Sequence, residues 1–348
     1  MIFLKKIFNS LFSEKTKDVI RRKLDGLFRY IDQKITFREY VKACKYILKK
    51  IIYDEKINDY SYRYDDFLNQ IKREYIRKKI ECEDIDIRGE EIDKCVDYVK
   101  KKGLDIYCGS LDGVCIYTEK DIGYDEENEL FYGIYVGKKL YFPEIVKSAK
   151  EALEDLNGLA AEQSEHSPHR YLSPTFDVDK QDIVFDIGCA DGNFALSIID
   201  KVKEVYLFEI EDIWMKPLEL TFAPYKDKVH IIKKCVTKKS DKLSTSLDDF
   251  CKINGIDRIG LIKMDVEGYE QDVLQRAKKM LKEGRIDKVV ACTYHRIDDA
   301  EKIGDLLPNY SKVFSEGYML GTMLYDIWDV KPPFFTRGLV RAKLETKN

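Results

Sequence analysis

The stretch VFDIGCADGNFAL, residues 184–196, decides the fold of this chain. It begins with mostly apolar residues, as a buried strand does, and ends with the start of an apolar helix. Two glycines, Gly188 and Gly192, lie in the turn between the two parts. A buried strand that turns through glycines into a helix commonly receives a nucleotide-like ligand at the turn.

From residue 176 onward, short apolar strands alternate with helical segments. The expected strands cover residues 182–188, 204–210, 228–236, 259–267, 288–295, 310–320 and 337–344. Strands separated by helices form βαβ crossovers. The pattern therefore predicts an α/β fold with a seven-strand, mostly parallel sheet that is covered by helices on both faces. In such sheets the ligand lies at the carboxyl ends of the strands, beside the first strand.

The residues before this region predict two further parts. Residues 1–103 show apolar positions at three- and four-residue steps and lack proline, which predicts a helical N-terminal region. Residues 104–175 are expected to hold a β-hairpin-like element, with strands at 112–121 and 129–143, and a connecting helix at 145–163. This middle part is an acceptor platform or a dimer contact, and the catalytic domain spans 176–348.

Composition limits the classes of function. The 60 Lys and Arg residues nearly balance the 63 Asp and Glu residues, for a net charge of −3, which argues against a nucleic-acid partner. Nine scattered cysteines without a CxxC pair indicate a reducing, cytoplasmic setting. Residues 1–13 form an amphipathic segment with two explanations: a helix docked on its own domain or on a second subunit of a homo-oligomer, or a peripheral membrane contact.

The spacing of the glycines distinguishes between ligands. No GxxxxGK[ST] run is present, and the dinucleotide pattern GxGxxG fails because Asn193 occupies its last position. The pattern acidic-x-Gly-x-Gly-x-Gly, used for S-adenosylmethionine, matches at Asp186, Gly188 and Gly192, with Ala190 at its middle glycine. S-adenosylmethionine carries no pyrophosphate, so a late glycine is not needed.

An acidic residue at the end of the next strand completes this prediction. Glu209 can accept hydrogen bonds from both ribose hydroxyls, and Ile210 can pack on an adenine. A carboxylate there also suits NAD, so it predicts a ribose without choosing the cofactor. The expected cofactor-binding residues are Asp186, Gly188, Cys189, Ala190, Asp191, Gly192, Asn193, Glu209, Ile210, Val236 and Asp265.

Residues 160–345 resemble FkbM-type methyltransferases, a branch of the class I (Rossmann-like) S-adenosylmethionine-dependent fold. The resemblance rests on SPHRY, VFDIGCADGNFAL, LFEIEDIW, TSLDDF and above all LIKMDVEGYEQDVL. It implies methyl transfer from S-adenosyl-L-methionine to a hydroxyl of a glycan, such as a surface polysaccharide, or of a secondary metabolite. The first 100 residues have no counterpart in this resemblance.

Methyl transfer to oxygen requires a base beside the methyl group. Asp265 ends the fourth strand, Glu267 follows it, and His295 ends the fifth strand, so these three are the catalytic candidates. Each of the three could instead have a purely structural role. Acidic residues stabilise the first turn of a helix, and a buried histidine often only makes hydrogen bonds within the fold. The same three residues can also hold a divalent metal such as magnesium or manganese, although no spacing supports it.

A second group of residues is expected to contact the acceptor. His169, Arg170 and Tyr171 lie in the loop before the first strand, and Glu270 follows the DVEG run. For the loop, the alternative is plain solvation. Two other functions stay open at this point: an NAD- or nucleotide-binding oxidoreductase on the same sheet, and a catalytically idle interaction module that keeps only the fold.

Overall fold

The computed structural model describes residues 80, 89–102, 105–236, 243–296, 298–320 and 334–345. The chain divides into two compact units, and nearly all described residues belong to the unit made of residues 86–98, 105–325 and 332–348. The expected membrane or subunit contact of residues 1–13 lies outside the described residues, as does most of the expected helical region. The described part of that region is helix α5 (Glu90–Lys102). The domain boundaries stay a prediction.

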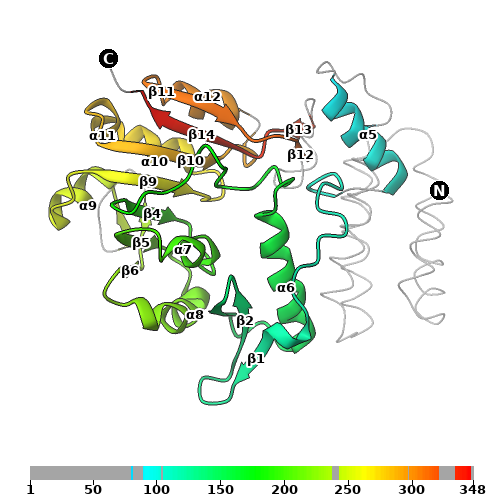
Figure 1. The fold of residues 1–348 in the computed structure, drawn as a ribbon. Helices are drawn as coiled ribbons and strands as arrows, with labels where there is room; N and C mark the ends of the chain where they lie inside the picture. Colours follow the sequence, from blue (N-terminus) through cyan, green and yellow to red (C-terminus); the bar gives the residue numbers. More distant parts are fainter. Residues whose placement is uncertain are drawn as a thin grey trace, which may run out of the picture. The chain divides into compact units, whose positions relative to one another are not determined.

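A seven-stranded sheet lies at the centre of the larger unit (Figure 1). Its order is β11-β14-β10-β9-β4-β5-β6, and all neighbours are parallel except β14, which runs antiparallel to both β10 and β11. This order and this single reversed strand confirm the predicted class I methyltransferase fold. The strands are β4 (Ile183–Ile187), β5 (Glu204–Phe208), β6 (Val229–Ile232), β9 (Ile259–Met264), β10 (Ile286–Cys292), β11 (Tyr310–Phe314) and β14 (Leu339–Leu344).

Helices cover both faces of the sheet because its strands are apolar on both sides. Val184 of β4 packs in one hydrophobic cluster, while Phe185 and Ile187 pack in a second cluster on the opposite face. The first cluster includes residues of α6 (Ala149–Glu162), α7 (Asn193–Ile198) and α8 (Asp212–Phe222). The second includes residues of α9 (Leu247–Asn254), α10 (Glu270–Arg276), α11 (Lys278–Lys282) and α12 (Asp299–Asp305).

The element before the catalytic sheet differs from its prediction. It is a three-stranded antiparallel sheet of β1 (Ile122–Asp125), β2 (Leu130–Tyr135) and β3 (Lys138–Tyr141). The strand expected at 112–121 is wrong, because that segment is a turn and loop ending in a short 3-10 helix at Glu119–Asp121. The strand expected at 129–143 is divided in two by Val136 and Gly137, which both have positive φ and form a tight turn.

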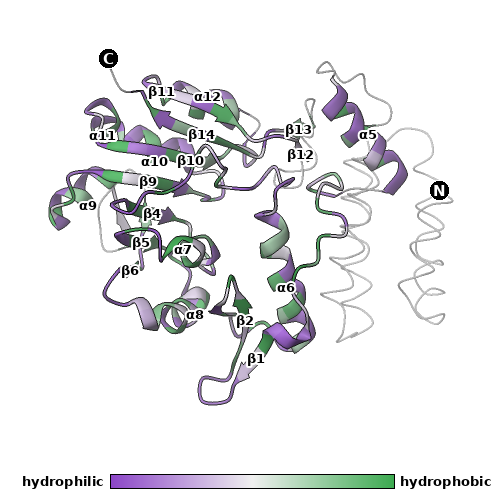
Figure 2. Cartoon of the chain, viewed as in Figure 1, coloured by the Kyte–Doolittle hydropathy of each residue, from purple (hydrophilic) through white to green (hydrophobic). Residues whose placement is uncertain are grey.

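Smaller strand pairs complete the described structure. β7 (Cys235–Val236) pairs with β8 (Ser244–Thr245), and β12 (Met319–Leu320) pairs with β13 (Phe335–Thr336). Figure 2 shows mainly hydrophobic residues in helix α7 and mainly hydrophilic ones in helix α5. Within the described residues, no helix combines the length and the apolar character needed to cross a bilayer.

The order of the strands brings the carboxyl ends of β4 and β9 together, at the edge of the sheet where a ligand is expected. The chain proceeds from β4 to β5 and β6 on one side, then returns to β9 and β10 on the other, so β4 and β9 meet at the switch point. Ile187 is opposite Met264 in their register. The segments that follow, which begin with Gly188 and Asp265, therefore leave the same edge side by side.

Candidate active site

The glycine turn packs tightly against the rest of the protein. Gly188 has φ +71°, and a Cβ there would lie 2.0 Å from the backbone oxygen of Asp265. Gly192 has φ +79°, and a Cβ there would lie 2.7 Å from the ring of Phe222 in α8. The two glycines are thus required by the positive φ and by close contacts within the chain itself, before any ligand is considered.

Glu209, at the end of β5, holds this turn in place. Its carboxylate accepts the backbone N–H of Ala190 at 3.0 Å, Ile210 at 2.6 Å and Glu211 at 2.9 Å. The side chain is buried. Oε1 accepts two of these N–H groups and Oε2 accepts one, so one lone pair on Oε2 remains for a ribose hydroxyl. The structure places Glu209 where the sequence predicted and adds its role in fixing the turn.

Asp186 lies beneath the turn and forms a buried ion pair. Its carboxylate is 3.0 Å from Nζ of Lys263, which also donates to the backbone oxygen of Gly188 at 2.6 Å. Both side chains are almost completely buried. Burial raises the pKa of Asp186, and the Lys263 ammonium opposes that rise. Alternation along β9 puts Lys263 on the same face as Asp265, and this would suggest an ion pair between them. In the structure the ion pair of Lys263 is with Asp186.

The remaining turn residues provide backbone and one further carboxyl group. Asp191 accepts the backbone N–H of Asn193 at 2.7 Å, and burial raises the pKa of Asp191 to about 7. Burial also raises the pKa of the Cys189 thiol. Val236, at the end of β7, is buried in the second hydrophobic cluster.

Asp265 is at the centre of a polar cluster at the end of β9. Its Oδ2 accepts the Tyr171 hydroxyl at 2.8 Å and lies 3.4 Å from Nε2 of His169. Its Oδ1 lies 3.4 Å from the Tyr294 hydroxyl and 3.4 Å from Nε2 of His295. Burial favours the neutral acid, but the two histidines and the lysine beneath the turn outweigh it and hold the pKa of Asp265 well below its usual range.

His295 is held between carboxylates. Its Nδ1 lies 2.8 Å from Oε1 of Glu270, which also accepts the backbone N–H of Val266 at 2.9 Å. Burial disfavours the charged ring, but Glu270 and the other nearby carboxylates outweigh it and raise the pKa of His295. Glu270 is completely buried, so the residue expected at the acceptor instead orients the histidine.

Glu267 differs from its two catalytic companions because it faces solvent. Its side chain is 80% exposed, and its Oε2 lies 3.7 Å from Nε2 of His295. Its φ of +51° is unusual for a residue with a side chain, and Gly268 follows at φ +92°. Tyr269 is 57% exposed. This turn therefore places an acid and an aromatic ring at the surface, directly after Asp265.

The loop before β4 contributes more than its sequence indicated. His169 is only 3% exposed, and its ring packs against Tyr107, Tyr171 and Tyr294 with ring centroids 6.5, 5.0 and 5.5 Å away. Arg170 lines a groove of about 430 Å³ between α6 and α7 instead. Two of the three loop residues, His169 and Tyr171, face Asp265, and Arg170 does not.

Several members of the cluster were absent from the predicted set. Cys292 and Tyr294 have no motif of their own, and neither has Lys263. The stretch KVVACTYH could have indicated Cys292 and Tyr294. The two lie two residues apart, and alternate positions of a strand share one face. Of the three residues expected to hold a metal, Asp265 and His295 are in contact and Glu267 lies at the exposed margin.

Comparison with known proteins supports the resemblance. Residues 223–311 match the family model of the methyltransferase FkbM domain, which confirms the predicted resemblance to FkbM-type methyltransferases. A comparison with curated proteins found no match.

Solved structures give distant similarities. The crystal structure of the methyltransferase FkbM from Methylobacillus flagellatus KT is 17% identical over 55% of this chain and 54% of that chain, with a TM-score of 0.39. An rRNA methylase from Streptococcus thermophilus is 15% identical over 48% and 90%, with a TM-score of 0.32. TrmK of M. capricolum, solved with S-adenosylhomocysteine, is 16% identical over 50% and 69%, with a TM-score of 0.33. The chain thus spans about half the length of the FkbM structure that it matches.

Proposed function

We propose that this chain is an S-adenosylmethionine-dependent O-methyltransferase that acts on a hydroxyl of a glycan or of a secondary metabolite. The observation that carries the proposal is the charge around the glycine turn. Three carboxyl groups, those of Asp186, Asp191 and Glu209, surround the turn, and the buried cation among them, Lys263, is already paired. Such a surface suits a ligand with a sulfonium and an ammonium group and opposes a pyrophosphate.

The residues present fit S-adenosylmethionine. In this proposal Glu209 accepts a ribose hydroxyl, Ile210 packs on the adenine, and Asp191, which accepts the backbone N–H of Asn193, meets the cationic amino acid portion. When bound, this cofactor supplies a methyl group on a positively charged sulfur. The protein's task is to place an acceptor oxygen in line with that methyl group and to remove its proton.

We assign proton removal to His295, whose Nε2 is buried 3.4 Å from Asp265 and 3.7 Å from Glu267. Glu270 occupies its Nδ1, so in the neutral ring the lone pair is on Nε2, which points toward Asp265. After proton transfer, the charged ring lies between Glu270 and Asp265, and both carboxylates stabilise it. Asp265 has a low pKa and is therefore a weak base, so its role is to stabilise this charge and to orient the hydroxyls around it.

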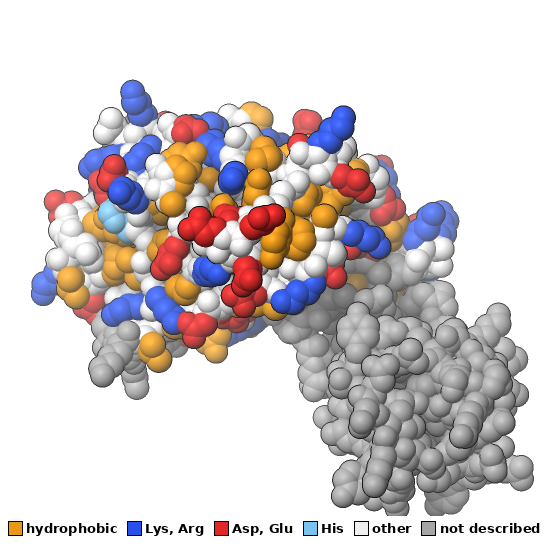
Figure 3. All heavy atoms as spheres, turned by 90° about the horizontal axis from the view of Figure 1, so that it is seen from below, with side chains coloured by type: hydrophobic (Ala, Val, Ile, Leu, Met, Phe, Trp, Pro, Cys, Tyr) orange, Lys and Arg blue, Asp and Glu red, His pale blue; other side chains and the backbone are white. Residues whose placement is uncertain are grey.

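The surroundings of His295 support a polar acceptor. Exposed Glu267 and Tyr269 lie at the edge of the site, and the half-exposed Arg296 follows His295 in the chain. A carboxylate, an aromatic ring and a guanidinium group are suited to the hydroxyls and ring faces of sugars or of polyketide-like molecules. On the face drawn in Figure 3, acidic side chains gather near the middle and basic ones lie around them, so that face carries no continuous basic groove for nucleic acid.

The proposal is tested by transfer of a labelled methyl group from S-adenosylmethionine to a panel of glycans and hydroxylated metabolites. We expect transfer in the wild type, and a loss on the order of 100-fold in His295→Gln with cofactor binding retained. The matched control is His230→Gln, a partly exposed histidine on β6. Tight binding of NAD without binding of S-adenosylmethionine, measured by calorimetry, would overturn the proposal in favour of an oxidoreductase.

A further inference from the structure

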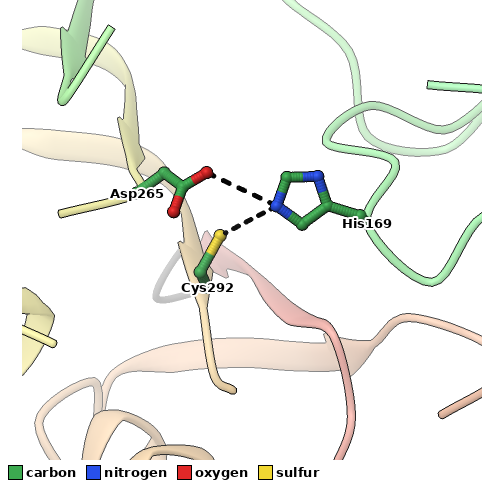
Figure 4. Close-up of side chains that lie close together, drawn as sticks. All are labelled: His169, Asp265 and Cys292. Carbon is green, nitrogen blue, oxygen red and sulfur yellow. Dashed lines mark hydrogen bonds and ion pairs between the residues drawn. The ribbon is translucent and has the colours of Figure 1, made fainter. Parts of the chain in front are cut away.

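Three side chains from separate parts of the fold converge on one point beside the proposed catalytic group. His169 comes from the loop before β4, Asp265 from the end of β9 and Cys292 from the end of β10 (Figure 4). The His169 Nε2 atom lies 3.4 Å from Oδ2 of Asp265 and 3.4 Å from Sγ of Cys292. The three ligand atoms all lie within 4.8 Å of one another.

Hydrogen bonding alone does not account for this arrangement. The same nitrogen of His169 also lies 3.1 Å from the hydroxyl of Tyr294, so it faces three polar atoms at once. A ring nitrogen has one proton or one lone pair, which serves one good partner. A hydrogen bond from a histidine to a carboxylate is normally about 2.7–2.9 Å, shorter than the contact to Asp265.

Two of the three distances match the edges of a metal coordination tetrahedron. Zinc lies about 2.0–2.1 Å from histidine nitrogen, about 2.0–2.2 Å from carboxylate oxygen and about 2.3 Å from cysteine sulfur, which places neighbouring ligand atoms roughly 3.3–3.6 Å apart. The contacts of His169 with Asp265 and with Cys292 are both 3.4 Å, and the ligand atoms of Asp265 and Cys292 lie within 4.8 Å of each other. The Tyr294 hydroxyl lies 3.1 Å from the same nitrogen of His169, and a water molecule can complete the set.

The second nitrogen of the histidine supports the same conclusion. Among the described residues its Nδ1 is buried without a hydrogen-bond partner, and it lies 3.9 Å from a carboxylate oxygen of Glu162 in α6, beyond hydrogen-bond distance. Glu162 is itself fixed by the Tyr107 hydroxyl at 2.8 Å. A metal-bound histidine usually directs its other nitrogen at such a carboxylate, which orients the ring and strengthens it as a ligand.

We propose that His169, Asp265 and Cys292 form a binding site for a divalent transition metal ion of the zinc type. A nitrogen, an oxygen and a sulfur donor together favour zinc over magnesium or manganese, which prefer oxygen ligands. The site shares Asp265 with the proposed catalytic cluster but uses Oδ2, while His295 faces Oδ1. Metal binding requires neither the cofactor nor an acceptor, so it can fail while the proposed methyl transfer stands, and the reverse.

The test uses the full chain after treatment with a chelator, with Zn²⁺ titrated against a chromogenic chelator and Co²⁺ as a spectroscopic probe. We expect one equivalent of metal and a thiolate-to-cobalt charge-transfer band. In Cys292→Ser this band should disappear, whereas Cys251→Ser, which removes a buried thiol in α9, should keep it. In Glu162→Gln the affinity should fall roughly 10- to 100-fold with the band intact.

Two results would contradict the proposed metal site. A wild-type protein that binds no stoichiometric Co²⁺, or binds it without a thiolate band, would overturn the site, and this measurement does not depend on any variant folding. A band that persists in Cys292→Ser would show that other thiols bind the ion and would also overturn it.

Discussion

Glu270 and His295 form a buried carboxylate–imidazole pair, with Oε1 and Nδ1 2.8 Å apart. The same oxygen accepts the backbone N–H of Val266, so the carboxylate is fixed by the turn that follows Asp265 as well as by its own helix. A carboxylate on one ring nitrogen determines which nitrogen is free to accept a proton. Glu270 is therefore a positioning residue for His295 within the proposed mechanism.

Replacement of Glu270 by Gln should impair methyl transfer while sparing the cofactor site. An amide does not stabilise the charged ring that forms after proton transfer, so we expect kcat to fall on the order of 100-fold. The dissociation constant for S-adenosylmethionine should stay within about threefold, because the residues expected to hold the cofactor, apart from Asp265, do not contact Glu270 or His295. Steady-state kinetics and calorimetry check the two values.

The control for this change is Glu301→Gln, an exposed glutamate on α12. It should leave both values unchanged. If Glu270→Gln retained full kcat, the pair would have a purely structural role and His295 would lose its orienting partner in the mechanism.

Removal of Lys263 should destabilise the fold through Asp186. In Lys263→Met the buried carboxylate loses the ammonium 3.0 Å away and the Gly188 carbonyl loses a donor. Breaking a buried pair from one side costs about 3–5 kcal/mol, because an uncompensated charge stays in the interior. The double variant with Asp186→Asn should recover part of this loss in urea unfolding, and no recovery would mean that the two residues are not coupled.

The sequence was sufficient to predict the sheet, because most of its strands are apolar on both faces and β4, β5, β9 and β10 are each followed by a helix. It also located Glu209 and Asp265, since the end of a strand is fixed once the strand is recognised. The segment at 112–121 shows where this reasoning fails. Its alternation suggests a strand, but the side chain of Asn157 accepts the backbone N–H groups of Ile116 and Tyr117 and holds them outside any sheet.

The cluster around Asp265 could be predicted only in part. His169 lies 96 positions before Asp265 in the chain, and no local pattern indicates that its loop folds over the end of β9. Cys292 is one of several scattered cysteines in the sequence, and Glu270 is expected there at the acceptor and not beside His295. Their roles depend on contacts between segments far apart in sequence, which periodicity does not report.

Gly188 should tolerate no side chain, because it combines a positive φ with a close contact to backbone. A second glycine, Gly255, has only the positive φ and therefore measures the two effects separately. In Gly188→Ala the new Cβ has both a positive φ and a backbone oxygen 2.0 Å away. Gly255 at the end of α9 has φ +66° with nothing within 4 Å, so Gly255→Ala measures the backbone cost alone. We expect losses in unfolding free energy of about 1 kcal/mol at Gly255 and of about 3 kcal/mol or more at Gly188. Equal losses would mean that the Asp265 carbonyl moves aside freely.

Asp191 should make stability depend on pH. Burial raises its pKa to about 7 in the folded protein from an ordinary value of 3.8. Between these values the folded state keeps a proton that the unfolded state has released, so the free energy of unfolding falls as pH rises through this window. The contribution is at most about 4 kcal/mol. In Asp191→Asn the free energy of unfolding should not fall in this way, so the variant becomes more stable relative to the wild type as pH rises from about 4 to about 7. The control Asp227→Asn, at an exposed site, should show the same pH dependence as the wild type.

The same group links pH to the proposed cofactor. If the cationic part of S-adenosylmethionine meets the Asp191 carboxylate, the ligand favours the ionised form, so binding should release a proton near pH 6 and affinity should rise as pH increases through about 7. Calorimetry in buffers of different ionisation enthalpy measures the proton release directly. In Asp191→Asn the affinity should be lower at pH 8 and should lose this pH dependence. A wild-type affinity that stays flat between pH 5 and pH 8 would place the cationic group of the ligand away from Asp191, at the Glu209 side of the turn.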